Sequence, residues 1–190
     1  LLTFLSKLDI IKINNKDIFE IKSIISENNN KYGISTSKTT NLAKQFSQKI
    51  FNKIPVLIGG EFLIGAIHAI RNQMNENAKS LAIYFPLPEL DHHLLEALTF
   101  PKNIQEYDHY IFFYSNLYSE KISKRSIITK DFVEQNGHKT SIFKPTGKSK
   151  LSQTIESIHF GSYMGYYLSL LYNIDPSPIH WVEEFKKKLG

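Results

Sequence analysis

The stretch IPVLIGGEFLIGAIHAIRNQMNENAKSLAIYF, from Ile54 to Phe85, decides the fold. It begins with a short apolar run that ends in a glycine pair, which is typical of a buried strand. Apolar residues at helical spacing follow from 62 to 78, and a second apolar run covers 80–85. Two nearly continuous apolar strands joined by a helix are the repeating unit of a parallel sheet covered by helices.

The same alternation extends through the rest of the chain. Further strands are predicted at 109–115 and 139–145, and further helices at 18–28, 36–52, 91–98, 119–137, 150–175 and 176–189, the last beginning at a proline. We therefore expect an α/β fold, a three-layer sandwich with four or five parallel strands flanked by helices. Ligands of such sheets bind beyond the carboxyl ends of the strands, which draws attention to Gly59–Gly60 and to the loop 86–93.

The composition excludes several classes of protein. The 190 residues, of which 42% are hydrophobic and 13% aromatic, suit one globular domain. The absence of cysteine excludes disulfides, thiolate zinc sites and thiol catalysis, and we expect a cytoplasmic location. No apolar run approaches the roughly 20 residues of a membrane span. The net charge of +5 favours anionic partners, but the lysines are scattered apart from Lys186–Lys188, so we expect no nucleic-acid binding.

The chain begins with Leu1 rather than with methionine. Its opening segment, LLTFLSKLDI, is too short for a signal peptide and is interrupted by Lys7 and Asp9. We therefore expect the sequence to be a fragment, or a chain whose upstream part is missing.

The glycine pair Gly59–Gly60 leads directly into a predicted helix. Free backbone N–H groups at such a turn can hold an anion. The alternative is a tight strand-to-helix turn that uses glycine for its backbone freedom, and a single glycine pair favours this alternative. The dinucleotide-binding spacing G-x-G-x-x-G is absent.

Titratable residues stand on both sides of the predicted strand at 80–85. Glu76 precedes it in NENAK, where the end of a helix is either a solvated polar tail or the source of a carboxylate for a pocket. His92 and His93 follow it after PLPEL, where a catalytic residue and an exposed imidazole are both reasonable. The pair lacks the H-E-x-x-H spacing, so no metal site is expected.

Three stretches resemble one enzyme family, the bifunctional phosphoglucose/phosphomannose isomerases. NENAKSLAIYFPLPELDHH (75–93) is similar to the family segment that reads roughly NENAK…ELPELNHN. TSKTTNLAKQFSQKIFNKIPVLIGGE (36–61) and SLLYNIDPSPIHWVEEFKKKLG (169–190) are similar to two further family stretches. Together the three stretches extend the resemblance over most of 36–190.

The resemblance implies a domain organisation. Family members carry two sugar isomerase (SIS) domains, each a flavodoxin-like five-stranded parallel sheet with helices on both sides. Residues 36–190 correspond to the C-terminal SIS domain, 1–35 become a connecting helical segment, and the N-terminal SIS domain, which holds most phosphate-binding serines and threonines, has no counterpart here. The long helix at 155–171 either packs against another SIS domain or forms the core of its own.

The resemblance also assigns catalytic residues. Glu76 matches the family's catalytic base, and His92 matches its ring-opening histidine, which the family supplies across a dimer interface. Lys186 matches a lysine that faces the substrate, with Lys187 as the alternative in register.

Several positions depart from the family pattern. His93 stands where the family has asparagine, and GGE at 59–61 replaces GSE. Ala69 stands where an arginine is common, and Arg71 where a lysine is usual. We take Gly59, Gly60, Glu61 and Arg71 as weaker candidates for binding the substrate or its phosphate.

The predicted function is aldose–ketose isomerisation of a phosphosugar, glucose 6-phosphate or mannose 6-phosphate to fructose 6-phosphate, in carbohydrate metabolism (glycolysis and gluconeogenesis). The reaction passes through an enediolate and requires no cofactor or metal. The expected partners are the phosphosugar and either a second copy of the chain or an N-terminal SIS half, without which we expect little activity. The alternatives are the isomerase domain of a glutamine–fructose-6-phosphate aminotransferase and a non-catalytic sugar-phosphate-binding SIS domain.

Overall fold

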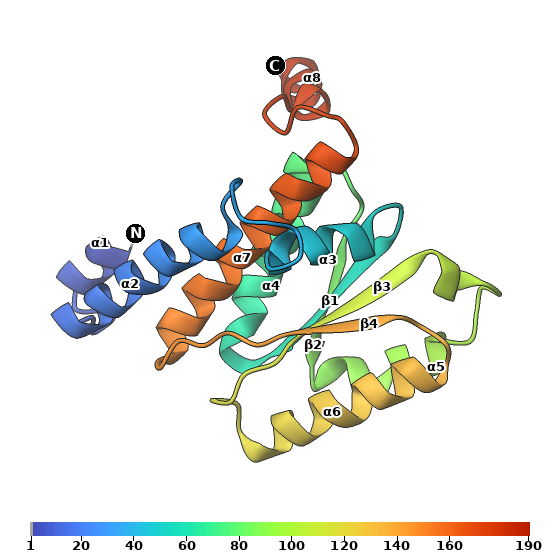
Figure 1. The fold of residues 1–190 in the computed structure, drawn as a ribbon, viewed down its shortest axis with the longest axis horizontal. Helices are drawn as coiled ribbons and strands as arrows, with labels where there is room; N and C mark the ends of the chain where they lie inside the picture. The colour runs from blue at the N-terminus through green and yellow to red at the C-terminus, as the bar shows by residue number, and fades with distance from the viewer. Residues whose placement is uncertain (1) are drawn as a thin grey trace.

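A computed structural model describes residues 2–190 and shows a sheet of four parallel strands flanked by helices (Figure 1). The strands are β1 (Ile54–Gly60), β2 (Ile83–Leu87), β3 (Asp108–Phe113) and β4 (Thr140–Phe143), in the order β2-β1-β3-β4. The predicted α/β sandwich is therefore confirmed, with the lower of the two expected strand numbers. β1 and β3 are central and almost wholly buried, as their apolar sequences require in a sheet covered on both faces.

The helices lie on both faces of this sheet. They are α1 (Leu2–Lys7), α2 (Asn15–Tyr32), α3 (Leu42–Ile50), α4 (Ile64–Asn77), α5 (Leu94–Ala97), α6 (Glu120–Gln135), α7 (Lys150–Leu171) and α8 (His180–Leu189), with the 3₁₀ turns η1 (Glu61–Leu63), η2 (Glu89–His92) and η3 (Ile104–Glu106). Figure 1 shows α3, α4 and α7 on one face, with α2 outside α7, and α5 and α6 on the other. None of these helices is long and apolar enough to cross a membrane.

Several elements differ in their bounds from the sequence-based expectation, among them α3, which begins at Leu42 rather than at 36, and three that carry or adjoin the candidate catalytic residues. The last helix begins at His180 rather than at 176, because Pro176 and Pro178 both lie in the connection that precedes it. The segment expected as one helix at 91–98 is divided between η2 and α5. The strand expected at 80–85 lies at 83–87, where Pro86 is tolerated because β2 is at the edge of the sheet.

The long helix α7 forms part of the core of its own domain, which was one of the two alternatives left open by the sequence. It packs against α2, α3 and α4, and its buried Phe160 stacks on Phe143 of β4 with ring centroids 3.9 Å apart. Where α7 crosses α4, a Cβ atom added at Gly161 would lie 2.4 Å from Cγ1 of Ile70. The two helices therefore approach so closely that only glycine fits between them.

Candidate functional site

Glu76 lies in the last turn of α4, on the side that faces away from the sheet. The apolar face of α4, made by Ala66, Ile67, Ile70 and Met74, is buried, whereas Glu76 is exposed. As the crossover between parallel strands β1 and β2, α4 runs back against the strand direction. Its end, with Glu76, therefore lies at the amino edge of the sheet, and the expectation of a site beyond the carboxyl ends does not hold for Glu76.

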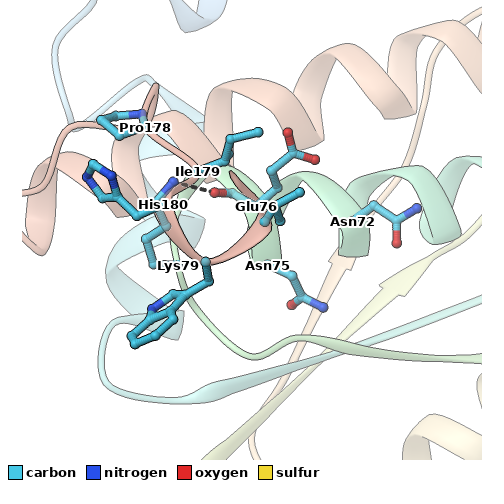
Figure 2. A pocket seen from close by; sticks show the side chains of 9 residues that line it. Asn72, Asn75, Glu76, Lys79, Pro178, Ile179 and His180 are labelled. Atoms are coloured by element: carbon cyan, nitrogen blue, oxygen red, sulfur yellow. Dashed lines mark hydrogen bonds between the residues drawn. The ribbon is translucent and has the colours of Figure 1, made fainter. Parts of the chain in front are cut away.

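A pocket of about 560 Å³ opens at this end of α4 (Figure 2). One wall comes from α4 and the turn after it, and the other from the connection before α8 and its first turn. The lining residues are Asn72, Asn75, Glu76, Lys79, Pro178, Ile179, His180, Trp181 and Val182. Glu76 thus lines a pocket because the C-terminal segment lies over the end of α4.

The sequence did not reveal the partners of Glu76 in this pocket. Asn72, Lys79, His180 and Trp181 line it, yet about 100 residues separate its two walls in the chain. No local spacing could indicate such a contact.

His92 ends the 3₁₀ turn η2 and is exposed. The preceding Asp91 fixes this turn to α6, because its carboxylate accepts from Nη1 of Arg125 at 2.8 Å and from Oγ1 of Thr129 at 2.7 Å. The following His93 pairs through Nε2 with Glu89 at 3.1 Å. Within residues 2–190, the imidazole of His92 has no hydrogen-bond partner. The side chain is therefore exposed to solvent on a turn whose backbone Asp91 fixes against α6.

One copy of the chain does not bring the three candidate catalytic residues together. Glu76 precedes the five-residue strand β2 and His92 follows it, so the two lie at opposite edges of the sheet. In Figure 1 the end of α4 lies near α8, far from α5, which follows η2. Lys186 and Lys187 are exposed on α8 and do not line the pocket at Glu76.

The turn at Gly59–Gly60 favours the structural interpretation that the sequence preferred. The N–H of Gly60 donates to the hydroxyl of Tyr118 at 2.9 Å, and a Cβ there would lie 2.7 Å from Ile122. The carboxylate of Glu61 accepts from the N–H of Ser119 at 3.0 Å, next to the first turn of α6. Because the N–H of Gly60 is buried and already bonded, and because the carboxylate of Glu61 is nearby, this turn is a poor binding site for an anion.

Arg71 lies apart from the pocket, over the ring of Tyr84 at 5.3 Å. The ring of His68, three residues earlier on α4, also stacks on Tyr84, with ring centroids 4.9 Å apart. The Nε atom of Arg71 is buried without a hydrogen-bond partner among the described residues. In residues 2–190, no group of three or more His, Asp or Glu side chains is arranged to hold a metal ion.

Comparisons with known proteins agree with this architecture. Residues 39–189 match the family of bacterial phospho-glucose isomerase C-terminal SIS domains. The chain is 28% identical to the bifunctional phosphoglucose/phosphomannose isomerase of Caldicellulosiruptor bescii, over 100% of the chain and 56% of that protein. It is 26% identical to the enzyme of the same name from Aquifex aeolicus, over 77% of the chain and 45% of that protein. The chain thus spans about half the length of these relatives.

Two solved structures share the fold. A glucose-6-phosphate isomerase-like protein from Thermus thermophilus superposes with a TM-score of 0.73 at 19% identity, over 91% of this chain and 56% of that one. The C-terminal domain of glucosamine-fructose-6-phosphate aminotransferase from Francisella tularensis superposes with a TM-score of 0.67 at 12% identity, over 86% of this chain and 46% of that one. At these identities the likeness concerns the fold alone.

Proposed function

The chain belongs to the family of bacterial phospho-glucose isomerase C-terminal SIS domains, and from this premise we propose that it supplies the acid/base half of an aldose–ketose isomerase acting on glucose 6-phosphate or mannose 6-phosphate. The product in both cases is fructose 6-phosphate. The observation that carries the proposal is the position of Glu76, which lines the pocket between α4 and α8.

The proposed chemistry moves one proton between neighbouring carbons. His92 opens the sugar ring, a task for a side chain that can both accept and donate a proton, as an imidazole does. Glu76 then removes the proton from C2 of the open-chain aldose, which gives an enediolate, and returns the proton to C1 to give the ketose. We assign the stabilisation of the negative charge that develops on oxygen to a lysine of α8, Lys186 or Lys187. The reaction has no net oxidation or reduction.

The pocket suits the reacting carbons better than the phosphate. Amides of Asn72 and Asn75 can hydrogen-bond sugar hydroxyls, and Ile179 and Trp181 supply an apolar wall. The one lysine in the lining, Lys79, already donates to two backbone carbonyls. We therefore place the phosphate on a surface outside this pocket, as an N-terminal SIS half or a second copy of the chain would provide.

The opposite positions of Glu76 and His92 support the involvement of a second copy. In a two-fold symmetric dimer, His92 of one protomer can complete the pocket that Glu76 lines in the other. The exposed imidazole of His92, on a turn held by Asp91, fits such a role. A single chain would then supply Glu76 to one pocket and His92 to another, and neither pocket would be complete without the second copy.

The test is the variant Glu76→Gln, which keeps the size and polarity of the side chain but cannot take up the proton. In a coupled assay of fructose 6-phosphate turnover, on the longest natural protein that contains this chain, the rate should fall by at least roughly 100-fold while substrate binding changes little. Glu96→Gln, a matched change of an exposed glutamate on α5, should be without effect. Full turnover in the Glu76→Gln variant would overturn the assignment.

A further inference from the structure

One ammonium group joins two segments that are far apart in the sequence. Nζ of Lys79 donates to the backbone carbonyl oxygen of Glu76 at 2.6 Å and to that of Pro176 at 3.3 Å (Figure 2 draws the first bond). The first carbonyl lies in the last turn of α4, where carbonyl groups have no partner within the helix. The second lies in the connection between α7 and α8. Lys79 therefore links the end of α4 to the segment that leads into α8.

The backbone conformation at Lys79 is fixed, and with it the position from which the Lys79 side chain begins. Its φ of 52° lies in the left-handed region, which is uncommon for a residue with a side chain and which ends α4. The next N–H, of Ser80, bonds back to the carbonyl of Met74 at 3.3 Å. The side chain of Asn75 accepts from the N–H of Ala82 at 2.7 Å. The turn is thus held on both sides of Lys79.

The C-terminal segment 175–190 has few other ties to the rest of the chain. None of the residues of α8 is buried. Among residues 2–190, the bond from Lys79 to Pro176 is the only hydrogen bond between this segment and the residues before it. A helix of 10 residues is marginal in water unless tertiary contacts support it. The position of α8 is therefore sensitive to what holds the connection before it.

The charge of Lys79 also acts on this connection. The pKa of Asp175 lies below its ordinary value, chiefly because the backbone and side chain of Ser177 donate to its carboxylate. The nearby ammonium of Lys79 acts in the same direction. The residues on either side of Pro176 are thus held in a compact turn that faces Lys79.

We propose that Lys79 is a positioning residue for the site at Glu76: it holds the connection before α8 against the end of α4 and so keeps Ile179 and Trp181 in the wall of the pocket that Glu76 also lines. The inference rests on the proposed function, because it concerns the pocket in which Glu76 acts. The two carbonyl bonds commit the ammonium to the pocket wall, so Lys79 shapes the pocket without carrying the substrate.

The structural part of this proposal is tested without any activity. Lys79→Met removes the ammonium but keeps a long side chain at the left-handed position, and Lys79→Arg keeps hydrogen-bond donors. Lys102→Met, at an exposed lysine with no hydrogen bond among the described residues, is the matched control. The two readouts are amide hydrogen exchange of 175–189 and fluorescence anisotropy of Trp181, which is the single tryptophan of the chain.

In Lys79→Met, exchange of 175–189 should become about five- to tenfold faster, the scale of the net loss of one ordinary hydrogen bond, and the anisotropy of Trp181 should fall. Lys79→Arg should restore most of the protection, and Lys102→Met should match the wild type. Unchanged exchange in Lys79→Met would overturn the link between Lys79 and the C-terminal segment.

The functional part is tested by kinetics in the longest natural protein that contains the chain. Lys79→Met should raise KM for fructose 6-phosphate and lower kcat/KM by about tenfold, while the pH profile stays that of the wild type because the acid/base groups remain. A loosened segment with unchanged kinetics would overturn the positioning role. Glu76→Gln should lower turnover by at least roughly 100-fold and leave exchange of 175–189 unchanged, so full activity in that variant would instead count against the proposed function.

Discussion

The crossing of α4 and α7 makes a quantitative prediction about stability. A Cβ atom at Gly161 would lie 2.4, 2.7 and 2.8 Å from Cγ1, Cγ2 and Cδ1 of Ile70. Ile70 is fully buried, and its branched side chain has few alternative rotamers in a helix. The variant Gly161→Ala must therefore push the two helices apart or strain Ile70, which costs about 1–3 kcal/mol of unfolding free energy.

The same helix provides the control. At Gly165, one turn further along α7, an added Cβ would meet only Cγ of Met74, at 4.0 Å. Both substitutions replace glycine by alanine in a helix interior, which by itself stabilises by about 1 kcal/mol. Gly165→Ala should therefore gain about 1 kcal/mol, and Gly161→Ala should be about 1–3 kcal/mol less stable than Gly165→Ala.

Urea unfolding followed by circular dichroism measures both variants, and thermal midpoints should differ by roughly 2–4 °C per kcal/mol for a chain of this size. In an Ile70→Ala background the clash is absent, so Gly161→Ala should there stabilise as Gly165→Ala does. Equal stabilities of Gly161→Ala and Gly165→Ala in the wild-type background would refute the packing argument.

Two further predictions concern histidines. His92→Ala should slow turnover of the ring form of the substrate far more than that of an open-chain analogue, whereas His93→Ala should be mild; equal effects would show that the alignment of His92 with the ring-opening histidine is wrong. His109 is 6% exposed, and burial, aided by the charges of Lys49 and Lys53, lowers its pKa from 6.5 to about 4. Between about pH 6.5 and about pH 4, His109 therefore binds a proton in the unfolded chain but not in the folded chain. The unfolding free energy should fall by roughly 2–3 kcal/mol as the pH drops through this range. His109→Gln should lack this component, and parallel pH profiles of the two proteins would contradict it.

The local sequence pattern predicted best those elements whose burial is determined by their place in the sheet. The bounds of β1 were predicted as observed, because an apolar run and a glycine pair mark both the burial and the end of a central strand. The edge strand β2 was placed too early, since its Pro86 and half-exposed residues weaken the pattern. The start of α8 was misplaced because proline at 176 allows either the first turn of a helix or a loop before it.

The site was less predictable than the fold. Glu76 and His92 were found through the resemblance of NENAK and PLPELDH to an enzyme family, and no periodicity would have selected them. The opposite wall of the pocket, at 178–182, depends on how the last residues of the chain return to the end of α4. Such a contact between distant segments is a property of the tertiary structure, so Lys79, His180 and Trp181 had no signal in the order of the residues.

The separation of Glu76 and His92 by the length of β2 has a genetic consequence. If each pocket takes its carboxylate from one protomer and its imidazole from the other, two inactive proteins can rescue one another. In a randomly mixed population of Glu76→Gln and His92→Ala chains, half of the dimers are hybrids, and each hybrid has one intact pocket and one that lacks both groups. About a quarter of the wild-type activity should then return in a cell that expresses both inactive forms.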